Sequence, residues 1–195
     1  MRFSEYAERN GGPILEVLRT EFAQCRSILE IGTGTGQHAV RFAAAMQHLQ
    51  WQTSDLAENH DDINAWIADS GLTNISPPLS LNVTTAKLAD VGYDGIFSSN
   101  TAHIMSYAAV QSMFSLVGSV LSAGGTFCLY GPMRQDGEFN TASNAEFDKS
   151  LRARNTESGI RDLVDLDALG LQHGLVRSNL YAMPANNNIA VWRTR

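Results

Sequence analysis

A short apolar run ends in three glycines at alternate positions, in the segment ILEIGTGTGQH at residues 28–38. Glycine allows sharp backbone turns and lets a ligand approach the main chain closely. Helix-forming residues follow from Gln37 to Met46, and the amides and positive dipole end of such a helix point at whatever occupies the turn. The segment therefore predicts a strand, a glycine loop (residues 32–36) and a helix that together hold a nucleotide-type cofactor.

The spacing of the glycines separates three kinds of cofactor site. A dinucleotide fingerprint, G-x-G-x-x-G, needs glycine where this chain has Gln37, and a phosphate loop needs Lys and then Ser or Thr after its last glycine. Glu30 followed by G-x-G-x-G instead resembles the first motif of class I S-adenosylmethionine-dependent methyltransferases. This resemblance implies that Glu30, Gly32, Gly34 and Gly36 contact S-adenosylmethionine. The simpler alternative is an ordinary strand-to-helix turn with Glu30 in solvent.

Composition limits the class of protein further. The chain has 195 residues, 44% of them apolar, which is enough for one domain with a substantial core. Its formal net charge of −6 opposes binding to nucleic acid, because that binding depends on clustered Lys and Arg. No run approaches the ~20 apolar residues of a membrane-spanning helix, and the first residues lack the apolar core of a signal peptide. We therefore expect a cytoplasmic protein that binds neither nucleic acid nor a membrane.

Short β-type runs alternate with helical stretches after the glycine loop, which is typical of a doubly wound α/β sheet. The expected strands are at 49–56, 79–83, 94–99 and 126–130. The expected helices are at 63–70 and 110–121. Pro77 and Pro78 are expected before the paired part of the third strand or at the periphery of the sheet. Gly124 and Gly125 are expected to form the turn before the fifth strand. Two final runs, 175–181 and 189–192, predict an antiparallel hairpin.

Two segments depart from this alternation and are expected to cover the site. Residues 11–13, Gly-Gly-Pro, predict a break that lets the N-terminal segment, residues 1–24, fold over the glycine loop as a lid. Residues 135–160 include a helical stretch at 140–154 and are expected to form an inserted helical cover. We treat residues 1–195 as a single domain with these two additions.

Further segments extend the resemblance over nearly the whole chain. They are FSEYAERNGGPILEVL (3–18), WQTSDL (51–56), NTAHI (100–104), LYGP (129–132), EFDKSLRARN (146–155) and MPANN (183–187). Together they are similar to small, uncharacterised methyltransferase-like proteins of bacteria and animals. The resemblance implies the Rossmann-like class I methyltransferase fold, with a mostly parallel seven-stranded sheet that ends in a C-terminal antiparallel hairpin. It implies no particular substrate.

Residues at the ends of the expected strands are further candidates for cofactor contacts. Asp55 lies about 20 residues after the last glycine, and its carboxylate can accept the two ribose hydroxyl hydrogens. Its alternative role is to cap the next helix. Asn82 and Val83 end the expected third strand, where the resemblance implies contacts with adenine, although Asn82 could equally be a plain turn residue. Ser99 closes the fourth strand at the expected switch point of the sheet.

Methyl transfer from a sulfonium needs alignment, exclusion of water and, for some acceptors, removal of a proton. Asn100 and His103 follow the fourth expected strand and are the catalytic candidates. His103 is the preferred general base, because an unperturbed imidazole titrates near neutral pH. A histidine that only caps or bonds a helix is the alternative.

Candidate contacts to the methyl acceptor come from the expected covers and from the end of the fifth strand. They are Arg9, Tyr130, Arg134 and Arg152, and an arginine among them can clamp a carboxylate. Asn10, next to Arg9, is a candidate cofactor contact. The His and Cys residues show no metal-ligand spacing, so no metal is expected.

Two functions remain open on the sequence alone. The favoured one is a methyltransferase that converts S-adenosylmethionine to S-adenosylhomocysteine and acts on a small polar or anionic molecule. The alternative is a non-catalytic module that binds or senses the cofactor, because no substrate motif is present. An NAD-dependent oxidoreductase is a weaker third candidate, because Gln37 breaks the dinucleotide fingerprint.

Overall fold

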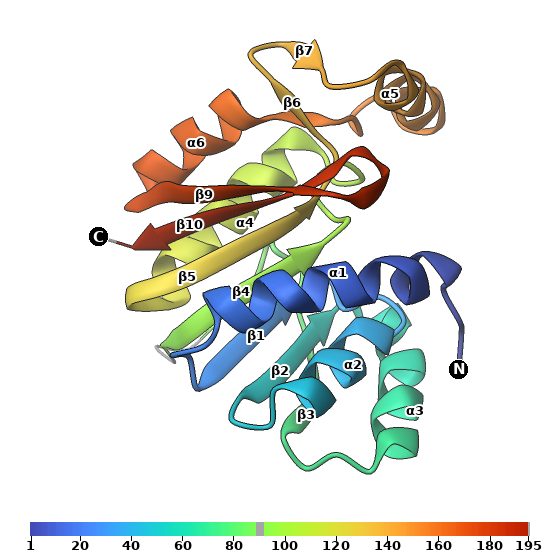
Figure 1. The fold of residues 1–195 in the computed structure, drawn as a ribbon, viewed down its shortest axis with the longest axis vertical. Coiled ribbons are helices and arrows are strands. Elements are labelled where there is room, and N and C mark those ends of the chain that lie inside the picture. Colours follow the sequence, from blue (N-terminus) through green and yellow to red (C-terminus); the bar gives the residue numbers. More distant parts are fainter. Residues whose placement is uncertain (89–91, 195) are drawn as a thin grey trace.

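A computed structural model describes residues 1–88 and 92–194, and Figure 1 shows the arrangement of the elements. The α-helices are α1 (Glu5–Glu21), α2 (Gln37–Ala45), α3 (His60–Ser70), α4 (Tyr107–Val120), α5 (Ala142–Arg154) and α6 (Leu163–Gln172). The strands are β1 (Ser27–Ile31), β2 (Gln50–Asp55), β3 (Ile75–Ser80), β4 (Tyr93–Ser99), β5 (Leu121–Gly131), β6 (Met133–Gln135), β7 (Glu138–Phe139), β8 (Arg161–Asp162), β9 (Leu175–Met183) and β10 (Asn187–Thr194). Two short 3₁₀ turns are η1 (Ala57–Asn59) and η2 (Pro184–Asn186). None of the described helices has both the length and the apolar composition needed to cross a membrane.

Seven strands form the main sheet in the order β3-β2-β1-β4-β5-β10-β9. Strands β1 to β5 pair in parallel, and β10 runs antiparallel to both β5 and β9. The predicted α/β fold, a mostly parallel seven-stranded sheet with a C-terminal antiparallel hairpin, is therefore confirmed. The strand order reverses between β1 and β4, which is the point where open α/β sheets bind ligands beyond the carboxyl ends of their strands.

Helices cover both faces of the sheet, because successive side chains of a strand point to opposite faces. Ile28 of β1 and Phe97 of β4 pack into one core with buried side chains of α1 and α2. Their neighbours Leu29 and Ile96 pack into the opposite core with side chains of α4 and α6. Figure 1 accordingly shows α1 and α2 in front of the sheet and α4 behind it. The edge where the parallel strands end is left for the loops that build the site.

The third strand begins earlier than the predicted 79–83. Strand β3 spans Ile75–Ser80, so Pro77 and Pro78 lie inside it instead of before it. The strand tolerates two prolines because it is at the edge of the sheet and because its register against β2 shifts between Gln52 and Ser54. Only the peripheral position expected for these prolines is confirmed.

The glycine pair expected to precede the fifth strand lies inside it. Strand β5 already begins at Leu121, and its register against β4 shifts opposite Gly124 and Gly125. Gly124 has a φ of +74°, a left-handed conformation that glycine adopts at little cost, so the pair forms a local irregularity. Helix α4 also begins about a turn before the predicted 110, because Ser106 Oγ accepts a hydrogen bond from Ala109 N at 3.2 Å and caps it.

Helix α1 is continuous through residues 11–13, so the predicted break in the chain is wrong. In a helix interior each glycine costs about 1 kcal/mol and a proline about 3 kcal/mol. Ile14, Leu18 and Phe22 are fully buried, and burial of each such side chain contributes about 1.5–3 kcal/mol. Burial of these three side chains offsets the penalty, and the second half of α1 is packed into the core.

Candidate functional site

The glycine loop turns sharply between β1 and α2. Gly32, Gly34 and Gly36 have φ values of +74°, +66° and +98°, which residues with side chains rarely adopt. A Cβ added at Gly32 would lie 2.6 Å from Thr101 Cγ2, so packing requires that glycine. A Cβ added at Gly34 would meet no described atom within 4 Å. Gly34 therefore borders open space, as a loop that receives a ligand requires.

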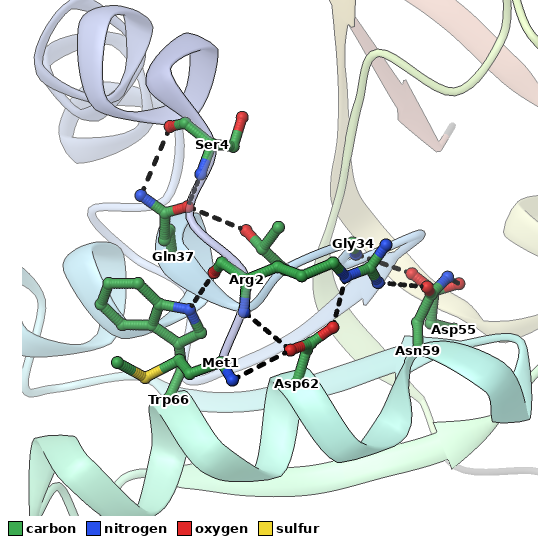
Figure 2. Close-up of polar contacts among 10 residues, drawn as sticks. Met1, Arg2, Ser4, Gly34, Gln37, Asp55, Asn59, Asp62 and Trp66 are labelled. Carbon is green, nitrogen blue, oxygen red and sulfur yellow. Dashed lines mark hydrogen bonds and ion pairs between the residues drawn. The ribbon is translucent and has the colours of Figure 1, made fainter.

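Asp55 ends β2 and fixes the glycine loop from the side (Figure 2). Its Oδ2 accepts a hydrogen bond from Gly34 N at 2.6 Å. Its Oδ1 accepts from Leu56 N at 2.7 Å and from Asn59 Nδ2 at 2.8 Å. A carboxylate offers about four acceptor positions, so Oδ2 keeps one for a ligand hydroxyl. Asp55 is 8% exposed and lies where the ribose contact was predicted.

Glu30 lies beneath the glycine loop and is 1% exposed. Its Oε2 accepts hydrogen bonds from Trp51 Nε1 at 3.0 Å and from Thr33 Oγ1 at 3.2 Å. Burial raises the pKa of Glu30 to about 7, although these two hydrogen bonds lower it in part. The carboxylate thus supports the loop from within, and the predicted direct contact with a cofactor is not what its surroundings favour.

The first residues of the chain cross beside the glycine loop (Figure 2). Arg2 N donates to Asp62 Oδ1 at 2.7 Å, and the Arg2 guanidinium pairs with the same carboxylate. The guanidinium also donates to Asn59 Oδ1 at 2.6 Å. The N-terminal segment is therefore tied to α3 through Asp62 and to η1 through the same Asn59 that contacts Asp55, next to the predicted ribose position.

A pocket of about 790 Å³, which we call the β4–β5 pocket, opens where these two strands end. Its lining comes from the start of α1, the loop after β4, the end of β5, helix α5 and the turn η2. The lining residues are Ser4, Tyr6, Arg9, Asn10, Asn100, His103, Ile104, Tyr130, Phe147, Leu151, Arg154, Pro184, Ala185 and Asn187. Tyr6 and Ile104 are 73% and 56% exposed, whereas His103 and Tyr130 are 7% and 3% exposed. The pocket therefore has an open, partly apolar rim and a buried polar floor.

Asn100 and His103, the catalytic candidates, lie close together at this floor. A Cβ added at Gly131 would lie 3.5 Å from His103 Nδ1 and 4.0 Å from Asn100 Oδ1. Asn100 has a φ of +59°, a strained conformation for a residue with a side chain, and such strain is concentrated at functional sites. Burial and the nearby charge of Arg161 lower the pKa of His103 to about 4, so its ring is neutral at physiological pH. A neutral imidazole can accept a proton.

Asn10 links the glycine-loop helix to the pocket. His38 Nε2, in the first turn of α2, lies 2.7 Å from Asn10 Oδ1, and the amide oxygen can only accept this hydrogen bond. Burial lowers the pKa of His38 to about 4, which keeps the ring neutral. Burial raises the pKa of Tyr130, and the side chains of Asn10 and Asn187 lower it in part. The bond between His38 and Asn10 joins the side chains of α1 and α2 at the edge of the pocket.

Three predicted cofactor contacts, Asn82, Val83 and Ser99, lie in surroundings that differ from those expected. Asn82 and Val83 follow β3 instead of ending it. Asn82 Oδ1 accepts from Thr84 N at 3.1 Å and from Thr84 Oγ1 at 2.8 Å, so Asn82 stabilises a turn. Ser99 Oγ accepts from Asn100 Nδ2 at 3.3 Å and thereby helps to orient that side chain.

Two of the four predicted acceptor contacts lie outside the pocket lining. Arg9 and Tyr130 line it. Arg152 instead donates from Nε to Asp148 Oδ2 at 2.7 Å, and Arg134 lies over the ring of Phe139 at 5.6 Å. The prediction placed Arg152 by its segment alone, but its position along α5 turns it toward Asp148.

The helical cover expected at residues 135–160 includes α5, but the residues of α5 that line the pocket were not among the candidates. Phe147, Leu151 and Arg154 line the pocket, and their spacing of four and three residues places them on one face of the helix. That spacing was a usable signal. Tyr6 and Ala185 offered none, because their positions depend on how distant segments pack.

The hairpin turn between β9 and β10 is held against α5. The carbonyl oxygen of Asn186 accepts from Asn144 Nδ2 at 2.9 Å and from Asn140 Nδ2 at 3.2 Å. Ala185 and Asn186 have φ values of +56° and +60°, so the turn is left-handed at residues other than glycine. The helix and the turn therefore form one cover over the pocket.

Comparison with solved structures identifies the fold. The chain superimposes on the mitomycin 7-O-methyltransferase MmcR with a TM-score of 0.84 at 14% identity, over 97% of this chain and 54% of that one. Human N-acetylserotonin methyltransferase in complex with S-adenosylmethionine gives 0.83 at 12% identity, over 97% and 53%. An O-methyltransferase family protein from Burkholderia thailandensis gives 0.80 at 13% identity, over 94% and 56%. The chain spans just over half the length of these proteins, and the likeness is one of fold.

One family model covers nearly all of the chain. The model described as "Protein of unknown function (DUF938)" matches residues 1–194.

Proposed function

This chain belongs to the DUF938 family, and we propose that it is an S-adenosylmethionine-dependent methyltransferase that acts on a small molecule. The observation that carries the proposal is the open space at Gly34, which lies beside Asp55. The same loop touches Thr101, which lies between Asn100 and His103 in the sequence. A cofactor at the glycine loop would therefore lie next to the floor of the β4–β5 pocket.

The described residues fit this cofactor. The glycine loop offers space for it at Gly34, and the remaining acceptor position on Asp55 suits a ribose hydroxyl. Asn82 and Val83 are our candidates for the adenine side, and Asn10 and Ser99 for the side facing the pocket. Glu30 supports the loop instead of touching the ligand.

The pocket residues supply the rest of the chemistry. When bound, S-adenosylmethionine supplies a methyl group on a sulfonium. His103 is neutral and buried, so it can accept a proton from an acceptor at the floor, and Asn100 can orient that acceptor through its amide. Phe147, Leu151 and Ile104 offer apolar surface to the bound acceptor.

A non-catalytic cofactor-binding module is the second candidate. It is favoured by the low pKa of His103, about 4, because such an imidazole is a weak base.

Cofactor binding is tested by calorimetry with S-adenosylhomocysteine, with NAD as the comparison. We expect binding of the first alone, and at about 100 times the dissociation constant a stabilisation of ~2.7 kcal/mol, or about 5–10 °C in Tm. Gly34→Val is expected to abolish binding. Gly71→Val is the matched control, since Gly71 has a φ of +64°, also faces open space and lies at the end of α3. Binding of NAD alone, or equal loss in both variants, would contradict the cofactor assignment.

Catalysis is tested separately, by incubating the protein with methyl-labelled cofactor and fractionated cell extract. The proposal expects label in the small-molecule fraction. Label in RNA or protein would contradict the small acceptor, and cofactor binding without any transfer would favour the non-catalytic module.

A further inference from the structure

The β4–β5 pocket carries positive charge that no neighbouring carboxylate of the described residues neutralises. Its described lining includes two guanidinium groups, from Arg9 and Arg154, and no Asp or Glu. Arg9 lies 4.9 Å from the ring centroid of Tyr6, and Arg154 Nε donates to the carbonyl oxygen of Ser150 at 3.2 Å. Among the described residues neither guanidinium has a carboxylate within 4.0 Å. In a chain of net charge −6, two such groups at one pocket favour an anionic ligand.

The rim that holds these arginines is also apolar. Tyr6, Ile104 and Phe147 are 73%, 56% and 37% exposed, although all three are large and apolar or aromatic. Exposed apolar side chains that gather around a concave, polar-floored pocket mark a ligand site. The lining therefore offers an apolar surface for the body of the ligand.

The arginines lie at the rim of the pocket, and the proposed catalytic group lies at its floor. Arg9 and Arg154 are exposed, whereas His103 and Tyr130 are buried at the floor. An anionic group that pairs with the arginines stays near solvent, where its desolvation is small. The reacting end of the same molecule must reach the floor.

Resting on the proposed function, we propose that the acceptor is an amphipathic carboxylate that binds with its charge at the rim. The carboxylate pairs with Arg9 and Arg154, and the apolar body lies against Phe147 and Ile104. The atom to be methylated is a hydroxyl, amine or thiol at the far end of the molecule, beside His103. The carboxylate itself is not the methylated group.

Matched probes test this orientation by binding alone. With the cofactor site saturated by S-adenosylhomocysteine, calorimetry compares para-hydroxycinnamate with its neutral amide, para-hydroxycinnamamide. We expect the carboxylate to bind more tightly. Arg9→Gln and Arg154→Gln should each weaken binding of the carboxylate by about 5-fold, and the double variant should weaken it further, with little change for the amide. Arg19→Gln on α1 and Lys149→Gln on α5 remove one cation each outside the lining and should leave the preference intact.

Tyr130→Phe tests the contribution of the pocket floor to binding. This variant is expected to lower the affinity for both probes by the same factor. The proposal would be overturned if the two probes bound equally or if neither bound. It would also be overturned if the preference for the carboxylate were lost in Tyr130→Phe but kept in the arginine variants. The substituted arginines are exposed, and the Tm of each variant checks that the fold is intact. Failure of S-adenosylhomocysteine to bind would instead contradict the proposed function, so the two failures are distinguishable.

Discussion

The glycine-loop side of the site and the β4–β5 pocket differ in how their polar groups are satisfied. On the loop side, Glu30 accepts two hydrogen bonds and Asp55 three, all from donors of the protein itself. On the pocket side, Arg9 contacts an aromatic ring and Arg154 a single carbonyl oxygen. The first half is held in shape before any ligand arrives, whereas the second keeps hydrogen-bond donors for the ligand.

The difference teaches which half defines the shape of the site and which half selects the ligand. A preorganised loop loses little entropy when it binds, so it suits a ligand of constant structure. Unpaired side chains on separate segments are easily changed one at a time. We therefore expect substitutions on the two sides to affect different ligands.

The largest expected effect is on the pocket side, from His103→Ala. If His103 accepts the proton of the acceptor, turnover should fall by ~10²–10⁴-fold. Affinity for S-adenosylhomocysteine should stay unchanged, because the glycine loop is not altered. Labelled-methyl transfer measures the first and calorimetry the second. A fall in both would show that the two halves are not separable.

The two halves should also respond oppositely to pH. The pKa of Glu30 is raised from 4.5 to about 7 in the folded state, so its contribution to stability is full below pH ~4.5 and is lost as pH rises toward ~7. The pKa of His103 is lowered from 6.5 to about 4, so its contribution is full above pH ~6.5 and is lost as pH falls toward ~4. Each of these pKa shifts corresponds to about 3 kcal/mol in the free energy of unfolding.

Urea unfolding at several pH values separates these contributions. Glu30→Gln keeps an acceptor for Trp51 and Thr33 and should raise the free energy of unfolding near pH ~8 relative to the wild type. His103→Gln should instead reduce the loss of stability between pH ~6.5 and ~4. The same pH profile in both variants and in the wild type would exclude the opposed titrations.

On the loop side, Asp55→Ala should lower the affinity for S-adenosylhomocysteine by about 10–150-fold, since charge-assisted hydrogen bonds contribute ~1.5–3 kcal/mol. Affinity for para-hydroxycinnamate, measured without the cofactor product, should not change. Asp62→Ala is the control, because Asp62 is a nearby acid that pairs with Arg2. Calorimetry that finds unchanged cofactor affinity would restrict Asp55 to its structural contacts.

The smallest effect is expected from Arg152→Gln. Arg152 pairs with Asp148 along α5 and is 46% exposed, so its loss should lower the free energy of unfolding by no more than ~1 kcal/mol. Binding of para-hydroxycinnamate should stay as in the wild type, in contrast to Arg154→Gln. A loss of carboxylate affinity equal to that of Arg154→Gln would place Arg152 in the site after all.

Local sequence patterns predicted the loop side far better than the pocket. The glycine spacing and the position of Asp55 follow from one strand, one turn and the next strand, so short-range rules are sufficient. Those rules could not show that Glu30 faces Trp51, because that contact joins two strands.

The pocket depends on packing between distant segments. The rules for glycine and proline predicted a break in α1, but buried Ile14 and Leu18 overrode that local preference. The segment containing Arg152 and Arg154 was recognised as a cover, yet only the helical phase decides which arginine lines the pocket. The left-handed backbone of Asn100 gave no signal in the sequence.

The bond from Asn144 to the carbonyl oxygen of Asn186 has a consequence for the evolution of specificity. This contact uses the backbone of the hairpin turn, so it does not depend on the Asn186 side chain but is lost with the helix that donates it. A descendant that shortens α5 would also release the turn that carries Ala185. We therefore expect the helix and the turn to change together, whereas residues of α1 such as Arg9 can change separately.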